Sequence, residues 1–404
     1  MKTNGNGMNS SKNSTVISKK IVWVENIPDY YLHKMAKIEI LKALAQNGHN
    51  VTLVMPYSSL RNKKIESIQI IAIPLKSIRL LTQLMFNIFL LLFLPIYILI
   101  RKPDFLITAP NGTIFGFFST FFLKKLGFKL CLDIRSTPVE IAGVQGLINL
   151  LCFNISVSIA KKMFDGITII TPLMKEEVCE SFSINPYKMG IFGSAVSTKL
   201  FEYKRYAEER KRMRNKFGLS DKFVVFYHGV FTPKRGLIEC VKAMSILKQR
   251  APKAVLFLLG TGNIVKELKN LIQEEMVQNN VILHDVVDYE DVPKYISICD
   301  LGIVPLPNIS YWRYQCPLKL LEYLAMEKTV ILTDLPAHRR IIDKKECGIF
   351  ISSTNPKEIS KAIMYAFENR DKLDKCGATG REIVLTNYTW KEAAKNLENF
   401  LLSL

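Results

Sequence analysis

Phe223-Val-Val-Phe-Tyr-His-Gly-Val-Phe-Thr-Pro-Lys-Arg-Gly236 joins an apolar run to a glycine turn, and a helical pattern follows it from Ile238 to Gln249. The apolar run is typical of a buried strand. A strand, a short turn and a helix form the repeating unit of parallel α/β sheets. The same alternation continues in both directions along the chain, so the sequence predicts an α/β fold with doubly wound, Rossmann-like sheets.

Two series of expected strands are separated by the highly charged stretch 203–216, interpreted as a solvated helix or a linker. The first series comprises 21–24, 51–54, 68–73, 105–108, 130–133 and 167–170. The second comprises 223–227, 254–259, 281–283, 301–304, 330–332 and 348–351. We therefore expect a disordered basic tail over 1–20, one domain over 21–204, a second over 205–385 and a closing helix over 386–404. Ligands of such sheets bind at the carboxyl ends of the strands, here beside a cleft between the domains.

Charge and cysteine spacing restrict the class of protein. The 404 residues include 55 Lys and Arg against 36 Asp and Glu, a formal net charge of +19. This charge suits an anionic membrane surface or a phosphate-bearing substrate, whereas no zinc finger, RNP motif or basic zipper indicates nucleic-acid binding. None of the eight cysteines forms a CxxC pair, and His228, His284 and His338 lack metal-ligand spacing, so we expect free thiols, structural histidines and no metal site. The polar N-terminus lacks the apolar core of a secretion signal, which predicts a cytoplasmic protein.

The apolar stretch 80–100 is about long enough to span a bilayer. It allows three interpretations: a buried helix of the first domain, a helix docked on a membrane surface, or a true span. Polar Thr82, Gln83 and Asn87 interrupt it, and Arg101-Lys102 close it with cations suited to anionic headgroups. We expect residues 80–102 to dock reversibly on the membrane, because the strands on either side belong to one sheet.

Two glycine turns of the second domain are candidate phosphate-binding loops. After the first strand come Gly229, Lys234 and Arg235, followed by a helix whose amides and dipole would attract an anion. After the next strand, Gly260 and Gly262 would let a ligand approach the backbone closely. The alternative is that both are ordinary turns between a strand and a helix.

Pro317-Leu-Lys-Leu-Leu-Glu-Tyr-Leu-Ala-Met326 is the most informative segment. Proline suits the first turn of a helix, so the backbone amides of Leu318, Lys319 and Leu320 are expected to be free for an anion. Glu322, one turn later, could accept hydrogen bonds from two vicinal hydroxyls. A diphosphate at the amides and a ribose at this carboxylate make a consistent nucleotide pose, with the Lys319 side chain either a further cation or a surface charge.

These features resemble the family 4 glycosyltransferases, which have the GT-B fold. The resemblance rests on the two domains, both glycine turns, the 317–326 segment and Cys299-Asp-Leu-Gly-Ile-Val-Pro305. The tail from Gly380 to Ala394 resembles the family's closing helices, which cross back to the first domain. The resemblance to this family implies two Rossmann-like domains facing each other across a cleft, with the acceptor on the first and a nucleotide-sugar donor on the second. It also implies retention of anomeric configuration, with neither a metal nor another cofactor.

Residue by residue, Glu322 matches the second glutamate of the family's Glu-x7-Glu motif, and Tyr314 stands where the first would be. The family's Gly-Arg after the strand is Gly229-Val230 here. Arg235 matches the phosphate-binding lysine that follows, with Lys234 as the alternative cation. The resemblance thus implies that Lys234, Arg235 and Lys319, with the helix amides, stabilise the departing diphosphate.

In the first domain, Leu132-Asp-Ile-Arg-Ser-Thr-Pro138 resembles the family's Asp-x-Arg stretch facing the cleft. It implies that Asp133 and Arg135 contact the acceptor or the donor sugar; the alternative is a structural ion pair. The acceptor loop expected after the first strand falls at 25–33 and contains no glycine.

The leading hypothesis is a transferase that moves a hexosyl or N-acetylhexosaminyl group from a nucleotide-sugar to a hydroxyl of a lipid-linked or cell-surface glycan. It would act as a peripheral protein on the cytoplasmic face of a membrane. The alternative is a catalytically degenerate nucleotide-sugar-binding subunit, which the substitutions at Tyr314 and Val230 motivate.

Overall fold

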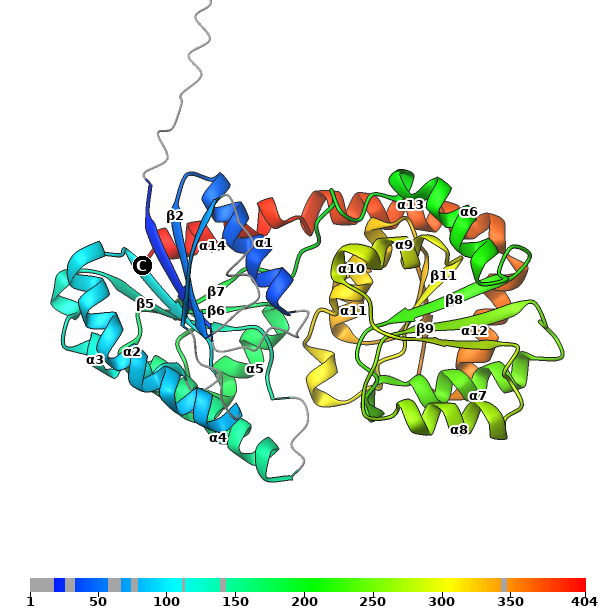
Figure 1. The fold of residues 1–404 in the computed structure, drawn as a ribbon, viewed down its shortest axis with the longest axis horizontal. Coiled ribbons are helices and arrows are strands. Elements are labelled where there is room, and N and C mark those ends of the chain that lie inside the picture. Colours follow the sequence, from blue (N-terminus) through cyan, green and yellow to red (C-terminus); the bar gives the residue numbers. More distant parts are fainter. Residues whose placement is uncertain are drawn as a thin grey trace, which may run out of the picture.

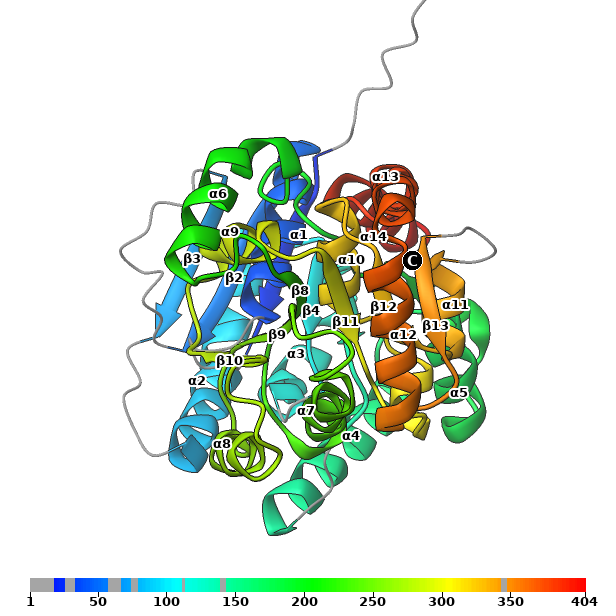
Figure 2. The ribbon, with the colours of Figure 1, turned by 90° about the vertical axis from the view of Figure 1, so that its right-hand side faces the viewer.

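A computed structural model describes residues 18–25, 33–56, 67–73, 79–110, 113–138, 143–342 and 347–404. Two parallel sheets, each covered by helices on both faces, lie side by side (Figure 1). Seen from the end of the molecule, the second domain stands in front of the first (Figure 2). The predicted pair of doubly wound α/β domains is confirmed.

The first sheet has seven strands in the order β3-β2-β1-β4-β5-β6-β7. Trp23 on β1, an inner strand, lies opposite Leu53 and Ile107 of its two neighbours. Most residues of the inner strands are buried, because helices cover both faces of a parallel sheet, whereas the edge strand Ile68–Ile73 is buried only at its two ends. The strands are β1 (Lys20–Val24), β2 (Asn50–Pro56), β3 (Ile68–Ile73), β4 (Phe105–Thr108), β5 (Lys129–Ile134), β6 (Gly166–Ile169) and β7 (Met189–Ile191).

Helices α1 (His33–Gln46) and α14 (Trp390–Leu402) cover one face of this sheet, where Leu44 and Leu397 pack in the same core as Trp23. The other face carries helices whose side chains form a separate core around Phe86 and Leu90. These are α2 (Arg79–Arg101), the short turn η2 (Thr113–Phe117), α3 (Phe118–Phe121), α4 (Gly143–Met163) and α5 (Pro172–Phe182). The turn η3 (Lys124–Leu126) follows α3 and buries no residue.

Helix α2 contains Leu84–Arg101, which by length and a mean hydropathy of 2.2 is the one helix in the described part of the chain that could cross a membrane. One side of it is nevertheless buried on the sheet through Phe86, Leu90 and Leu94. The Asn87 Oδ1 accepts a hydrogen bond from the Gly116 amide at 3.0 Å. This asparagine therefore points into the domain and does not interrupt the outward apolar face, contrary to the sequence interpretation.

The second sheet has six strands in the order β10-β9-β8-β11-β12-β13. Its strands are β8 (Phe223–His228), β9 (Ala254–Leu259), β10 (Val281–His284), β11 (Leu301–Val304), β12 (Val330–Thr333) and β13 (Gly348–Ile351). The helices are α6 (Ala207–Lys216), α7 (Leu237–Leu247), α8 (Val265–Glu274), α9 (Val292–Ser297), α10 (Leu318–Ala325), α11 (Pro336–Ile342), α12 (Pro356–Glu368) and α13 (Arg370–Asn387).

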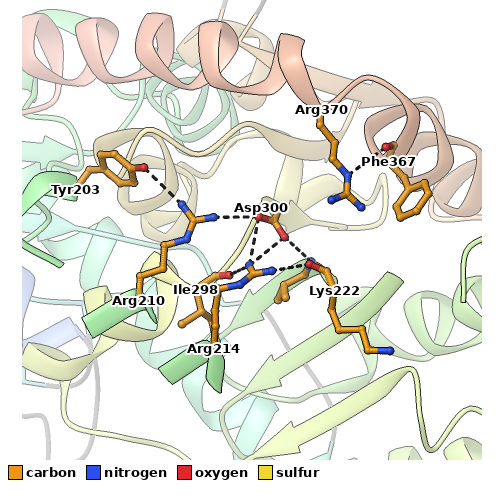
Figure 3. A network of polar contacts seen from close by, with 9 residues as sticks. Tyr203, Arg210, Arg214, Lys222, Ile298, Asp300, Phe367 and Arg370 are labelled. Carbon is orange, nitrogen blue, oxygen red and sulfur yellow. Dashed lines mark hydrogen bonds and ion pairs between the residues drawn. The ribbon is translucent and has the colours of Figure 1, made fainter. Parts of the chain in front are cut away.

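The charged stretch before this sheet forms η5 (Tyr203–Tyr206) and α6, and Asp300 anchors the helix (Figure 3). Its carboxylate lies 3.1 Å from Arg210 and 3.2 Å from Arg214, and it accepts from the Val224 amide at 2.8 Å. Arg214 also donates to the carbonyl of Ile298 at 2.6 Å. The stretch is therefore a packed helix whose arginines hold it against the amino edge of the sheet.

The chain leaves the second domain along α13 and returns to the first through α14 (Figure 1). Asn47 donates to Glu398 at 2.9 Å, and the Phe400 ring covers Gly190 so closely that a Cβ there would lie 2.1 Å from it. The Thr389 hydroxyl begins α14 by accepting from the Glu392 amide at 3.3 Å. The last helix thus completes the core of the first domain, and α13 runs to Asn387, past the expected boundary at 385.

Candidate functional site

The two predicted glycine turns pack directly against each other at the carboxyl edge of the second sheet. A Cβ on Gly260 would lie 2.0 Å from the carbonyl oxygen of Gly229, and one on Gly262 would lie 2.0 Å from that of Phe231. The Phe231 amide donates a hydrogen bond to the backbone carbonyl of Thr261 at 2.8 Å. Gly260 also has a φ of +148°, which disfavours any residue with a side chain. Glycine at 260 and 262 is therefore required for the two turns to meet.

The cations after β8 lie in the turn η6 (Pro233–Arg235) and face different surroundings. The Lys234 side chain is exposed, while its carbonyl accepts from the Trp312 indole at 2.9 Å. The Arg235 guanidinium is half-buried over the Trp312 ring, 4.9 Å from its centroid, and its Nε donates to Thr232 at 3.3 Å. Arg235 is therefore the cation that is held in place at this edge.

Helix α10 begins at the same edge, after Pro317, which caps it without a side-chain hydrogen bond. The Leu320 amide donates to the Pro317 carbonyl at 3.0 Å, so the expectation that it is free is wrong. The amides of Leu318 and Lys319 precede the first bond of the helix and lie at the positive end of its dipole. Two amides, rather than three, are thus available to an anion.

Lys319 is 8% exposed, and its buried ammonium has no hydrogen-bond partner within the described part of the chain. It lies 3.7 Å from the centroid of the Tyr227 ring and 3.1 Å from where a Cβ on Gly229 would be. Burial lowers the pKa of Lys319 well below its ordinary value, and the charge of nearby Arg235 lowers it further. A buried cation without an acceptor is costly, so this position favours an anionic ligand.

Glu322, one turn further along α10, is buried, accepts a side-chain hydrogen bond and lies close to an imidazole. Its Oε2 lies 3.1 Å from the Nε2 of His228, and its Oε1 accepts from the Tyr289 hydroxyl at 2.9 Å. Burial, and then the Glu322 charge, raise the pKa of Tyr289 well above 10, so this hydroxyl stays protonated and donates. His228 therefore contacts a predicted site residue.

Predicted residues of the first domain belong to a different network. The buried Asp133 accepts from Lys37 and from the Thr168 hydroxyl, each at 2.9 Å. Lys37 also lies 3.0 Å from Glu25 and 4.1 Å from the Trp23 ring centroid. The charge partner of Asp133 is thus Lys37, a residue that sequence reasoning missed.

Arg135 faces the second domain instead of pairing with Asp133. It donates to the Phe192 carbonyl at 3.1 Å and stacks on the Phe192 ring, 4.3 Å from its centroid. Burial raises the pKa of Cys316, which directly precedes α10, to about 12. A hydrogen bond with Ser194 and the charge of Arg135 act in the opposite direction. The Thr171 hydroxyl donates to the Tyr314 carbonyl at 2.6 Å. The segment leading to α10 is therefore attached to the first domain. Of the acceptor loop expected at 25–33, residues 26–32 lie outside the described residues.

Solved structures share this fold over nearly the whole chain. HepE of Anabaena, in complex with UDP and glucose, superimposes with a TM-score of 0.74 at 15% identity and covers 96% of this chain and 100% of its own. The sucrose-phosphate synthase of Thermosynechococcus elongatus gives 0.75 at 16% identity, covering 95% and 99%. The chain has the GT-B fold of glycosyltransferases.

Residues 209–383 match the family described as "Glycosyl transferases group 1", so the match falls on the second domain. Among curated relatives, the putative glycosyltransferase YtcC of Bacillus subtilis is 24% identical over 261 residues, 60% of this chain and 62% of the relative. A GDP-mannose-dependent alpha-(1-6)-phosphatidylinositol monomannoside mannosyltransferase of Mycolicibacterium smegmatis is 22% identical over 48% of this chain and 51% of its own length. The chain thus spans half to three fifths of these two relatives.

Proposed function

We propose that this protein is a glycosyltransferase that moves a sugar from a nucleotide-sugar to an acceptor hydroxyl. The observation that carries the proposal is the buried Lys319 ammonium, without a partner in the described chain, beside the amide end of α10 and one turn before Glu322. The family match on the second domain and the UDP complex of HepE support a nucleoside diphosphate as the bound group.

In this proposal the diphosphate lies at the Leu318 and Lys319 amides, between the side chains of Lys319 and Arg235. A ribose hydroxyl pair hydrogen-bonds to Glu322, whose carboxylate is oriented by Tyr289 and lies beside His228. Negative charge grows on the diphosphate as the glycosidic bond breaks, so fixed cations and amides stabilise the transition state more than the ground state. We propose that they do so without a metal or other cofactor.

The finer parts of the activity are also proposals. The transferred group is a hexosyl or N-acetylhexosaminyl unit, its configuration is retained, and the acceptor is a lipid-linked or cell-surface glycan. The names of the relatives support this acceptor class: one acts on a phosphatidylinositol monomannoside, and a Bacillus subtilis relative is a putative glycosyltransferase of teichuronic acid biosynthesis. We place the protein on the cytoplasmic face of a membrane, supported by its charge of +19 and the outward apolar side of α2.

The test is a donor screen with the purified full chain, using UDP-, GDP- and ADP-sugars and reading both bound and released nucleoside diphosphate. Release that depends on Glu322 supports the transferase. Binding of a nucleotide-sugar with no turnover in the presence of membrane lipid extracts favours the alternative, a degenerate binding subunit, which the residues Val230 and Tyr314 motivate. Absence of binding to every donor contradicts both.

A further inference from the structure

Large exposed apolar side chains are concentrated on one side of the first domain. Of the 24 found among the described residues, 16 lie on α2, on the segment 113–126 and on α4. Single exposed apolar residues are normal on a protein surface, whereas a cluster of this kind marks an interaction site. We call this cluster the apolar platform.

Helix α4 contributes to the platform mainly through its first turns. The sequence alone does not reveal which side of this helix faces outward. Val144, Leu147 and Leu151 are 75%, 60% and 59% exposed and follow the spacing of one helix face. Further along, the exposed positions become polar at Asn154, Ser158 and Lys161. Apart from Met163 at its last position, the exposed apolar side chains of α4 therefore lie in its first half.

The platform is continuous, since the segment 113–126 joins its two helices. A Cβ on Gly116 would lie 2.6 Å from the Leu90 Cβ of α2, and the ring of Phe121 lies 6.1 Å from that of Phe164, directly after α4. Exposed Phe122, 88% accessible, lies between the two helices in the chain. In both ribbon views α2 and α4 lie along the same lower side of the molecule (Figures 1 and 2).

Charge identifies what covers the platform. Each of its three parts contributes two Lys or Arg residues and none contributes Asp or Glu. Arg101 and Lys162 are exposed at the ends of α2 and α4. A symmetric contact with a second copy would bring together two rims rich in Lys and Arg, in which Lys124 alone is seen paired with an acid, Asp165 at 3.1 Å, among the described residues. An anionic bilayer instead takes the apolar side chains into its interface and attracts the cations to its headgroups.

The exposed apolar residues of α4 lie close to the edge of the first sheet that faces the proposed site. Helix α4 follows β5, so its first half starts at the carboxyl edge of the first sheet, the edge of Asp133 and Arg135. We propose that this first half of α4, together with α2, inserts into the surface of an anionic phospholipid membrane and brings that edge against the headgroups. The inference rests on the proposed function where it assigns this edge to a lipid-linked acceptor.

The experiment is flotation of the full chain with vesicles of phosphatidylcholine, with and without phosphatidylglycerol. We expect binding that needs the anionic lipid and weakens with salt. Leu147→Gln with Leu151→Gln should reduce partitioning about tenfold or more, because two half-exposed leucines no longer enter the bilayer. The matched control is Ile246→Gln with Leu385→Gln on the second domain, where the exposures are 45% and 47%.

Wild-type protein that does not float with anionic vesicles, or an α4 double variant that floats like the control, would overturn the inference. A dimer that the same α4 variant dissociates, without vesicle binding, would also overturn it. Nucleoside diphosphate binding is measured on the same preparations. Flotation without nucleotide binding contradicts the proposed function and leaves the membrane inference standing. Nucleotide binding without flotation overturns the membrane inference and leaves the proposed function standing.

Discussion

The imidazole Nε2 of His228 lies 3.1 Å from Oε2 of Glu322, with both side chains buried. One residue ends a strand and the other begins the second turn of a helix, so the contact joins β8 to α10. The Tyr289 hydroxyl holds the other carboxylate oxygen at 2.9 Å. The Tyr289 hydrogen bond orients the carboxylate, and its remaining lone pairs are those that a diol would need.

Replacing Glu322 with Gln should lower the affinity for the donor nucleotide about tenfold or more, because hydrogen bonds to a charged acceptor are the stronger ones. Calorimetric titration with the nucleoside diphosphate that the donor screen identifies measures the change. Glu290→Gln, an exposed glutamate next to Tyr289, is the matched control. Unchanged affinity in the Glu322 variant would remove this residue from the site.

Replacing Lys234 and Arg235 together with Ala should reduce kcat by about a hundredfold, and more than it reduces donor affinity, since the leaving-group charge peaks in the transition state. Single variants refine this expectation. Arg235→Ala should carry most of the loss, because the Arg235 side chain is held over Trp312 whereas that of Lys234 is exposed. Loss of affinity at full kcat would contradict the electrophilic role.

Nucleotide binding should depend on pH through Lys319. Burial depresses the pKa of this lysine, so a diphosphate, which favours the charged form, should bind with uptake of a proton. Affinity then falls as pH rises through the depressed pKa, at lower pH than for an ordinary lysine near 10.4. Titrations in buffers of different ionisation enthalpy measure the proton uptake. Lys319→Met should abolish it, and Lys234→Met should not. Uptake that survives in the Lys319 variant would contradict this role.

Stability in acid should depend on His338. Burial lowers its pKa from 6.5 to about 4, and its Nδ1 is held 2.7 Å from the Thr333 carbonyl oxygen. The unfolded chain binds a proton between these values and the folded chain does not. The free energy of unfolding should therefore decrease as pH falls from 6.5 towards 4, by about 3 kcal/mol in full. Urea titrations should show a shallower decrease in His338→Gln; an equal slope in both proteins would contradict the assignment.

The sheets were predictable because each buried parallel strand is a short apolar run, as in the stretch that β9 occupies. Strand β7 was missed, since three residues, Met189–Ile191, carry too little pattern. The helix predicted from Ile238 to Gln249 is α7, which begins at Leu237 and ends at Leu247. The local signals therefore located the elements better than their ends.

The site was predictable where it depends on neighbours in sequence, as for Lys319 and Glu322 on one helix. The roles of His228, Tyr289 and Lys37 were not, because each contacts a residue from a distant part of the chain. For the same reason the sequence could not decide between ligand contacts and an ion pair for Asp133 and Arg135, which lie two residues apart. The structure gives their side chains different partners.

The return of α14 to the first domain has a consequence for biosynthesis. Leu397 and Leu401 cover the same core as Trp23, yet α14 begins about 200 residues after β7 ends. At about 5–20 residues per second, the ribosome needs roughly 10–40 s to supply that interval. During this time the first domain emerges with one face of its sheet incompletely covered. Its folding is completed only after the second domain has been synthesised, so a nascent chain stalled before α14 should be a substrate for chaperones although all seven strands have been made.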